Sequence, residues 1–149
     1  MTIKVEIPNL RKALDALAQS PGIIGTRLNN AIKKSIYEIE KEAKPRTPVV
    51  TGRLRSSYQT EFRPLYGSLS PMVNYAIYVH EGTKPHIISV KRAKVLTDGK
   101  IFFGKVVHHP GTKAQPFLRE GIEASMDSIR NYFEQEINAG LEEIAGKGS

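Results

Sequence analysis

The chain has 149 residues, with 22 Lys or Arg and 15 Asp or Glu, so its formal net charge is +7. A chain of this length buries enough surface to fold around one core without disulfides or a structural metal, which excludes a stapled mini-protein. The sequence contains no cysteine, so a thiol nucleophile and a cysteine-based zinc site are also excluded.

Two helices are predicted at the start of the chain. A short stripe of leucines indicates a helix over about residues 9–18. Apolar residues that recur every three or four positions then predict a longer helix over about residues 21–44, with one buried face. Ser20 is the expected N-cap of this second helix, and Pro45 is expected to end it.

The middle of the chain, over about residues 53–107, is predicted to form strands. Apolar and polar residues alternate cleanly over residues 53–63, which indicates a strand with a mainly basic outward face. Residues 75–79 fit either a strand or a short helical turn, and the sequence leaves this choice open. The dipeptide Asp98-Gly99 favours a tight turn, so a protruding hairpin is expected around it.

The clearest predicted element is a C-terminal helix over about residues 116–144, where apolar residues recur at spacings of three and four. Residues 145–149 are expected to be a frayed tail. The whole chain, 1–149, is therefore predicted to be a single α+β domain. Long amphipathic helices are expected to pack on one face of a mainly antiparallel, strongly curved sheet that carries the hairpin.

Charge is unevenly distributed along the chain. Residues 1–43 carry seven basic and five acidic side chains (+2), residues 44–113 carry twelve and three (+9), and residues 114–149 carry three and seven (−4). A basic middle and an acidic end indicate attraction to a polyanion or attraction between copies of the chain. The outward face of the C-terminal helix is expected to be acidic and to include Glu120, Glu123, Asp127, Glu134, Glu136 and Glu142.

The sequence shows no convincing catalytic or metal site. Residues 99–105 have the glycine and lysine spacing of a phosphate-binding loop, but Val106 stands where Ser or Thr would hold magnesium. His80 and Glu81 lack the later histidine of a helical zinc site, and the adjacent pair His108-His109 points to opposite faces of an extended chain. We therefore expect a non-enzymatic protein without a cofactor.

Two short segments resemble each other, because Gly-Thr occurs both at residues 82–83 and at residues 111–112, with a proline nearby in each case. This pattern is ordinary turn chemistry, so the segments are interpreted as two corners of the fold and not as an internal repeat.

Four pieces of sequence occur in order: a Thr-Gly-x-Leu corner, a Tyr-Ala-x-Tyr-Val segment running into Gly-Thr, a lysine-rich hairpin region, and a Pro-Gly-Thr segment running into Pro-Phe-Leu. In this order they resemble the tail-completion or head-tail joining (neck) proteins of long-tailed phages, a family typified by the tenth gene product of a lambda-like Hong Kong phage. The residues that carry the resemblance, and to which it gives a structural role, are Thr51, Gly52, Leu54, Tyr75, Ala76, Tyr78, Gly82, Thr83, His109, Pro110, Gly111, Thr112, Pro116 and Phe117.

The resemblance implies a structural virion component at the head-tail junction of a phage or prophage, present in the host cytoplasm during assembly. It implies a ring of several copies that helps to complete the tail or join it to the DNA-filled head. The implied partners are other copies of the chain, the head connector, the tail terminator or tube proteins, and packaged double-stranded DNA without sequence preference. No membrane partner is expected.

Two sets of charged residues are hypothesised to act in such a ring. Glu123, Asp127 and Glu134 are expected to lie near the basic region of the next copy and to guide its register. A basic set is expected to face the DNA channel or the joint with the portal and to contact phosphates only; it comprises Arg53, Arg55, Lys91, Arg92 and Lys94. The alternative hypothesis is a free basic nucleic-acid-binding module.

Overall fold

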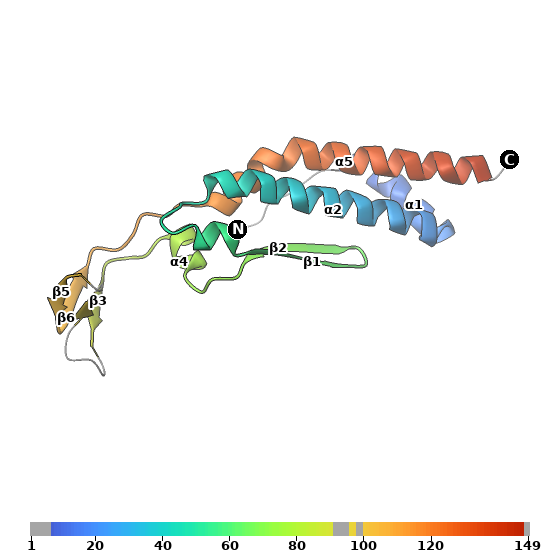
Figure 1. Ribbon diagram of the computed structural model, residues 1–149. Helices are drawn as coiled ribbons and strands as arrows, with labels where there is room; N and C mark the ends of the chain where they lie inside the picture. The colour runs from blue at the N-terminus through green and yellow to red at the C-terminus, as the bar shows by residue number, and fades with distance from the viewer. Residues whose placement is uncertain (1–6, 91–95, 98–99, 148–149) are drawn as a thin grey trace. The chain divides into compact units, whose positions relative to one another are not determined.

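A computed structural model describes residues 7–90, 96–97 and 100–147 (Figure 1). It contains both helices and small antiparallel sheets, so the predicted α+β class is confirmed. The chain divides into two compact units, of which the first comprises Met1–Val73 and Phe117–Ser149 and the second comprises Asn74–Pro116. Within the described residues, no helix is both long enough and apolar enough to cross a membrane.

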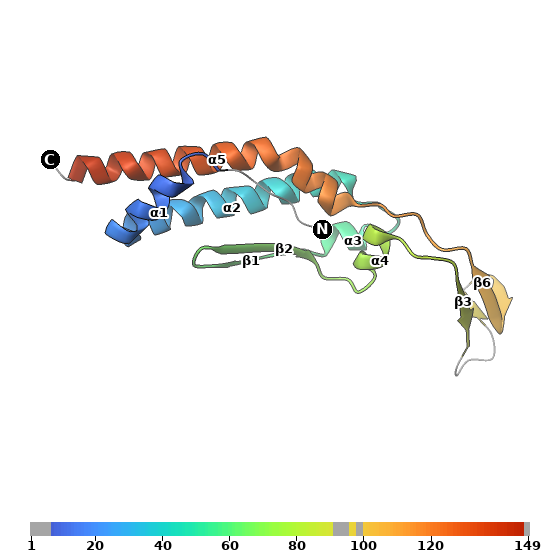
Figure 2. The same cartoon turned by 180° about the vertical axis from the view of Figure 1, so that it is seen from behind.

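The three predicted helices are present in the first unit as α1 (Leu10–Gln19), α2 (Pro21–Arg46) and α5 (Phe117–Lys147). Figures 1 and 2 show α2 and α5 side by side, with α1 packed against one end of the pair. The two long helices run in opposite directions, because the start of α5 meets the end of α2.

Two helix ends differ from the prediction. Helix α2 keeps Pro45 within its last turn, because the Thr47 N–H bonds back to the Ala43 carbonyl (2.9 Å) and closes that turn. Helix α5 continues to Lys147, whose ammonium pairs with Glu143 (3.4 Å) one turn earlier. This part of the tail is therefore helical and not frayed, while the last two residues lie outside the described range.

Helices α2 and α5 approach closely because small residues line their contact. A Cβ added at Gly121 would lie 2.8 Å from the Cα of Ala43, and one added at Gly140 would lie 2.8 Å from the Cδ1 of Ile24. Ser125 is fully buried in the same contact, and its hydroxyl donates a hydrogen bond to the Gly121 carbonyl (2.7 Å). The buried hydroxyl of Ser125 therefore has its hydrogen-bond partner.

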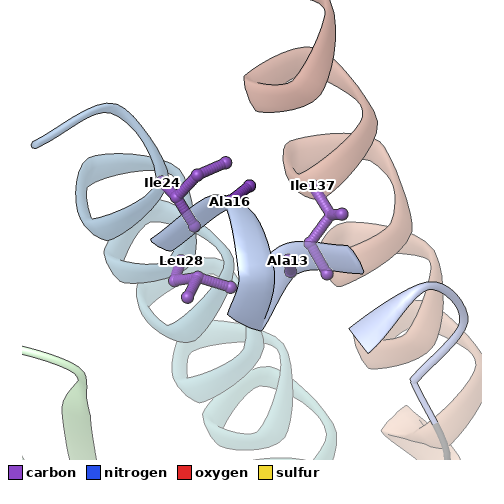
Figure 3. Close-up of a cluster of buried hydrophobic side chains, with 5 residues drawn as sticks. All are labelled: Ala13, Ala16, Ile24, Leu28 and Ile137. Atoms are coloured by element: carbon purple, nitrogen blue, oxygen red, sulfur yellow. The ribbon is translucent and has the colours of Figure 1, made fainter. Parts of the chain in front are cut away.

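An apolar cluster joins α1 to the two long helices (Figure 3). Its members are buried side chains from all three helices, so it fixes α1 against the pair. The buried residues are Ala13, Ala16, Ile24, Leu28 and Ile137, and Ile7, Leu17, Phe133, Leu141 and Ile144 pack around them.

Helix α2 also packs against an antiparallel hairpin formed by β1 (Tyr58–Arg63) and β2 (Tyr66–Pro71). Figures 1 and 2 show α2 between this hairpin and α5. Gly67 allows the contact, because a Cβ at this position would lie 2.7 Å from Ile32 and 2.9 Å from Ile36 of α2. Helix α2 therefore buries two faces, where the sequence predicted one.

The predicted strand over residues 53–63 is wrong at its start. Arg53–Ser56 forms a single helical turn, α3, and the strand begins only at Tyr58. Gly52 precedes α3 with φ at 77°, a left-handed conformation that glycine adopts freely, and Leu54 is buried. The alternation of apolar and polar residues at the start of this segment comes from a helical turn that buries Leu54, not from a strand. Arg53 and Arg55 therefore do not lie on one strand face with Arg63.

A small polar and aromatic cluster lies at the end of the first unit from which α5 starts. The Thr47 hydroxyl lies 2.8 Å from the Ala43 carbonyl and 2.9 Å from the Tyr58 hydroxyl. The Tyr58 ring meets that of Phe117 edge to face, with centroids 6.5 Å apart. Burial raises the pKa of Tyr58, while the hydrogen bond with Thr47 lowers it, so the cluster favours the neutral phenol.

The described strands form three separate two-stranded antiparallel sheets, so the expected single, strongly curved sheet is not present in the described residues. One sheet belongs to the first unit and two belong to the second, where strands of four residues or fewer pair locally. Pairing of β4 with β5 confirms the predicted hairpin, although its Asp98-Gly99 turn lies outside the described residues. The remaining strands are β3 (His86–Ser89), β4 (Leu96–Thr97), β5 (Phe102–Gly104) and β6 (Val106–His109).

Glu136 is buried between the long helices, so its predicted place on the outward acidic face is wrong. One carboxylate oxygen accepts a hydrogen bond from the Lys34 ammonium (2.6 Å), and the other lies 3.5 Å from the Arg27 guanidinium. Arg27 also pairs with Glu143 (3.1 Å), and this hydrogen bond is the main reason that the pKa of Glu143 is lowered. Since folding lowers that pKa, the stabilisation by Glu143 is present at neutral pH and is lost as the pH falls below 4.5, the ordinary glutamate value.

Gly121→Val is expected to lower the free energy of unfolding by about 1–3 kcal/mol, because an added side chain has no room between the helices. Gly25→Ala is the matched control, since Gly25 also lies inside a long helix but nothing lies within 4 Å of its added Cβ. Alanine there should be neutral or stabilise by up to about 1 kcal/mol. Urea denaturation measures both variants, and a Gly121→Val protein as stable as the parent would contradict the close helix contact.

Glu136→Gln is expected to destabilise the protein by about 1–3 kcal/mol, because two basic side chains of α2 lose their charged acceptor. The partial exposure of both partners keeps the loss below that for a fully buried ion pair. Glu142→Gln removes an exposed charge from the same helix and should change stability by less than about 0.5 kcal/mol. Equal urea midpoints for the two variants would show that the buried pairs contribute nothing.

Candidate interaction site

The second unit starts with a short helix. The segment that the sequence left open is α4 (Ala76–Glu81), so it forms a helical turn and not a strand. The Gln115 N–H donates to the Val79 carbonyl (3.0 Å) and ties the end of the unit to this helix. Ala76 is buried, whereas Tyr78 is 60% exposed.

The two Gly-Thr segments pair with each other. Thr83 and Thr112 exchange both backbone hydrogen bonds, at 3.0 and 3.1 Å, and their hydroxyls lie 3.0 Å apart. Gly82 and Gly111 precede them with φ of 73° and 87°, and a Cβ at Gly82 would lie 2.6 Å from the Thr112 carbonyl oxygen. The two segments therefore form one backbone contact, an isolated antiparallel bridge, here called the Gly-Thr clasp.

An antiparallel ladder of β3 and β6 follows the clasp and places two histidines opposite each other. The His86 and His109 rings stack with centroids 5.0 Å apart. The Gly111 N–H donates to Nδ1 of His109 (3.0 Å), so this nitrogen carries no proton, whereas Nδ1 of His86 lies 2.9 Å from the Lys84 carbonyl and donates to it. His108 pairs with Ile87 on the other face of the ladder, as the sequence predicted.

An open hollow of about 300 Å³ lies between α4, the clasp and the ladder. Its wall is mostly apolar and aromatic, with polar groups at the rim. We call it the clasp hollow; its lining residues are Tyr75, Tyr78, Val79, Thr83, His86, Ile88, His109, Thr112, Lys113 and Gln115. A second hollow shares Tyr78 with it and adds Lys84.

The second unit has almost no buried core. Among its described residues only Ala76 is buried, whereas six large apolar side chains are exposed. A two-stranded ladder and a six-residue helix bury too little apolar surface to be stable alone. These exposed side chains are Tyr75, Ile77, Tyr78, Ile87, Ile101 and Val106. Tyr75 and Tyr78 line the clasp hollow together, and adjoining exposed apolar side chains mark interaction surfaces.

Only Arg53 and Arg55 of the predicted basic site lie within the described residues. Arg53 is exposed, whereas Arg55 is half-buried and donates to the Thr47 carbonyl (3.4 Å). The Nε atom of Arg55 is buried and has no acceptor within the described residues. Lys91, Arg92 and Lys94 lie outside the described residues.

The predicted acidic site lies on the exposed side of α5. Glu123 and Asp127 are exposed and Glu134 is half-buried. Asp127 lies 3.6 Å from Arg130, a weak pair at a side chain that is 93% exposed. Glu123 and Asp127 are therefore open to solvent on neighbouring turns of one helix, and Glu134 lies about two turns further on and is only partly exposed.

The residues that carried the family resemblance fall into two places. Thr51, Gly52 and Leu54 form the turn into α3, and Phe117 is buried in the first unit at 1% exposure. Among the others, the residues that line the clasp hollow are Tyr75, Tyr78, Thr83, His109 and Thr112. The remaining ones lie next to these in sequence and are Ala76, Gly82, Pro110, Gly111 and Pro116. Sequence reasoning missed the hollow itself, for which the repeated Gly-Thr dipeptide was the available signal.

Within the described ranges, no group of three or more His, Asp or Glu side chains is arranged to hold a metal ion. Comparisons with protein-family models, curated proteins and solved structures gave no match to this chain. The assignment of a function therefore depends on the geometry described above and on the sequence motifs.

Gly111→Ala is expected to break the Gly-Thr clasp, because the new Cβ would collide with the Thr83 carbonyl oxygen. Gly104→Ala is the matched control, since Gly104 has the same φ of 87° but open space at its Cβ position. Backbone strain of about 1–3 kcal/mol is common to both variants, and the collision is present only in the first. Amide hydrogen exchange at Thr83 and Thr112 should accelerate in Gly111→Ala alone; equal protection in both variants would contradict the clasp.

Proposed function

We propose that this chain is a structural subunit at the head-tail junction of a phage or prophage virion, where several copies form a ring that completes or joins the tail. The observation that carries the proposal is the second unit, a clasped backbone with exposed apolar side chains and almost no core of its own. Such a unit is suited to packing against another protein and not to enclosing a reaction. The order of the sequence motifs supports the choice of a phage neck protein.

The charge distribution supports association between copies. Residues 74–116 carry seven basic and two acidic side chains (+5), whereas residues 117–147 of α5 carry three and seven (−4). Two different patches that attract each other make a head-to-tail contact, which closes into a ring when the rotation between neighbours allows it. Glu123, Asp127 and Glu134 then guide the register of the next copy.

Contact with neighbours above and below the ring also has a candidate surface. Val49 and Val50 are 52% and 97% exposed in the loop between α2 and α3. Thr47 is buried at one end of this loop and Leu54 at the other, so both ends of the loop are anchored in the first unit. A short anchored loop loses less conformational entropy than a free segment on binding to a portal or tail protein.

The genome contact in this proposal involves phosphates only, because packaged DNA must slide through the ring. Arg53 and Arg55 lie beside the exposed valine loop and contribute in the first unit. Lys91, Arg92 and Lys94 contribute from the second unit. Base-specific contacts would hinder passage, so none belongs to the proposal.

A phage or lysogen from which the gene is deleted is expected to accumulate filled heads and finished tails that stay unjoined. Electron microscopy of the lysate measures the fraction of joined particles, and expression of the wild-type chain from a plasmid is the control. Infectious particles at wild-type titre from the deletion strain would overturn the proposed function.

Arg53→Ala is expected to weaken binding to duplex DNA at all sequences alike and to reduce the slope of log K against log salt by about 1. Arg11→Ala, an exposed arginine of α1, is the control and should leave the slope unchanged. Binding that is sequence-selective and persists at high salt would refute phosphate-only contact. A monomer that changes its gel-filtration volume only with DNA would favour the alternative, a free nucleic-acid-binding module.

A further inference from the structure

We propose that the clasp hollow of one copy receives the acidic outward face of α5 from a second copy. This face is defined by the exposed residues Glu120, Glu123, Ala124 and Asp127 in the first turns of the helix. The proposal deepens the proposed function and rests on it, because it names the contact that would join neighbouring subunits.

The clasp hollow offers hydrogen-bond donors and positive charge around apolar rings. Tyr75 and Tyr78 are 40% and 60% exposed, and within the described residues neither hydroxyl has a hydrogen-bond partner. Lys113 lines the same hollow and forms no ion pair with a described residue. Glu81 lies close to Tyr78 in sequence, but its carboxylate is already paired with the His80 ring (2.7 Å). The matching ligand therefore carries carboxylates beside a small apolar surface.

The outward face of α5 has this composition. Glu120 and Glu123 form no ion pair among the described residues, and Asp127 has only its long contact with Arg130. Ala124 lies among these carboxylates and is exposed, so a tyrosine ring can lie against the helix beside it. The next exposed positions of the helix, at Asn131, Gln135 and Asn138, are uncharged, and the next exposed carboxylate is Glu142 near the end of the helix. The exposed carboxylates are therefore densest in its first turns.

Charge favours helix α5 of a second copy as the partner of the clasp hollow. The second unit carries +5 and α5 carries −4, so the contact joins the basic and the acidic parts of the chain. Duplex DNA would satisfy Lys113, but its phosphates offer no apolar surface to Tyr75 and Tyr78, which are 40% and 60% exposed. A second copy supplies carboxylates and an apolar spot on one rigid helix.

The absence of cysteine from the sequence permits a direct cross-linking test. A size-tagged Tyr78→Cys protein is mixed with an untagged Ala124→Cys protein and oxidised, and a tagged–untagged heterodimer is expected on a non-reducing gel. Asn138→Cys, exposed on the other half of the same helix, replaces Ala124→Cys in the control and should give a yield lower by about tenfold. Equal yields from the two mixtures would overturn the proposed contact.

A charge exchange tests the same contact without cysteines. Lys113→Glu and Glu123→Lys are each expected to weaken self-association about tenfold in light scattering, and an equimolar mixture of the two proteins is expected to recover part of the loss. Lys33→Glu reverses an exposed charge on α2 and serves as the control. Loss in both single variants without recovery in the mixture would overturn the pairing.

These results separate the two proposals. A chain that assembles normally with every variant, or that stays monomeric at all concentrations, overturns the docking of α5 in the clasp hollow. The proposed function fails only if the deletion strain still joins its heads and tails.

Discussion

The close contact of α2 with α5 is the constraint on which the rest of the first unit depends. Gly121 and Ala43 bring the backbones together at the end of the pair, where α2 ends and α5 starts. The same end holds the hydrogen bond between Thr47 and Tyr58 and the ring contact of Tyr58 with Phe117. The helix contact and the polar and aromatic cluster therefore share one end of the first unit. A residue larger than glycine at position 121 would disturb both.

The second unit is held together mainly by backbone hydrogen bonds and not by side-chain packing. Its order comes from backbone hydrogen bonds in the Gly-Thr clasp and the β3–β6 ladder, while almost all of its described side chains remain at least partly exposed. Backbone pairing fixes geometry but adds little net stability in water, because the same groups hydrogen-bond to solvent when unpaired. The apolar burial that usually stabilises a domain is therefore small among the described residues of the second unit. This division gives the chain one unit that is stabilised by packing and another that is ordered mainly by backbone pairing.

The helices could be predicted from the sequence and the long-range contacts could not. Periodicity located α1, α2 and α5 because each buries a continuous apolar stripe, and Ile24 and Ile137 lie in the core as expected. The same pattern failed at Arg53–Ser56, where one helical turn imitates the alternation of a strand. It also failed at Glu136, because the basic partners of this carboxylate lie more than a hundred residues earlier in the chain. The Gly-Thr clasp joins residues 29 positions apart, and a local pattern gives the two turns but not their pairing.

The second unit carries basic charge beside exposed apolar side chains, whereas helix α5 carries acidic charge. This separation favours contact between unlike surfaces of two copies. A surface that is both apolar and basic does not bind a second surface of its own kind well, because the like charges repel each other. The clasp hollow, with Lys113 beside Tyr75 and Tyr78, is such a surface, and the outward face of α5 is its acidic counterpart. Contact between unlike patches favours head-to-tail arrangement over a two-fold dimer. In the proposed assembly, a ring follows from that preference when the angle between neighbours allows the contacts to close.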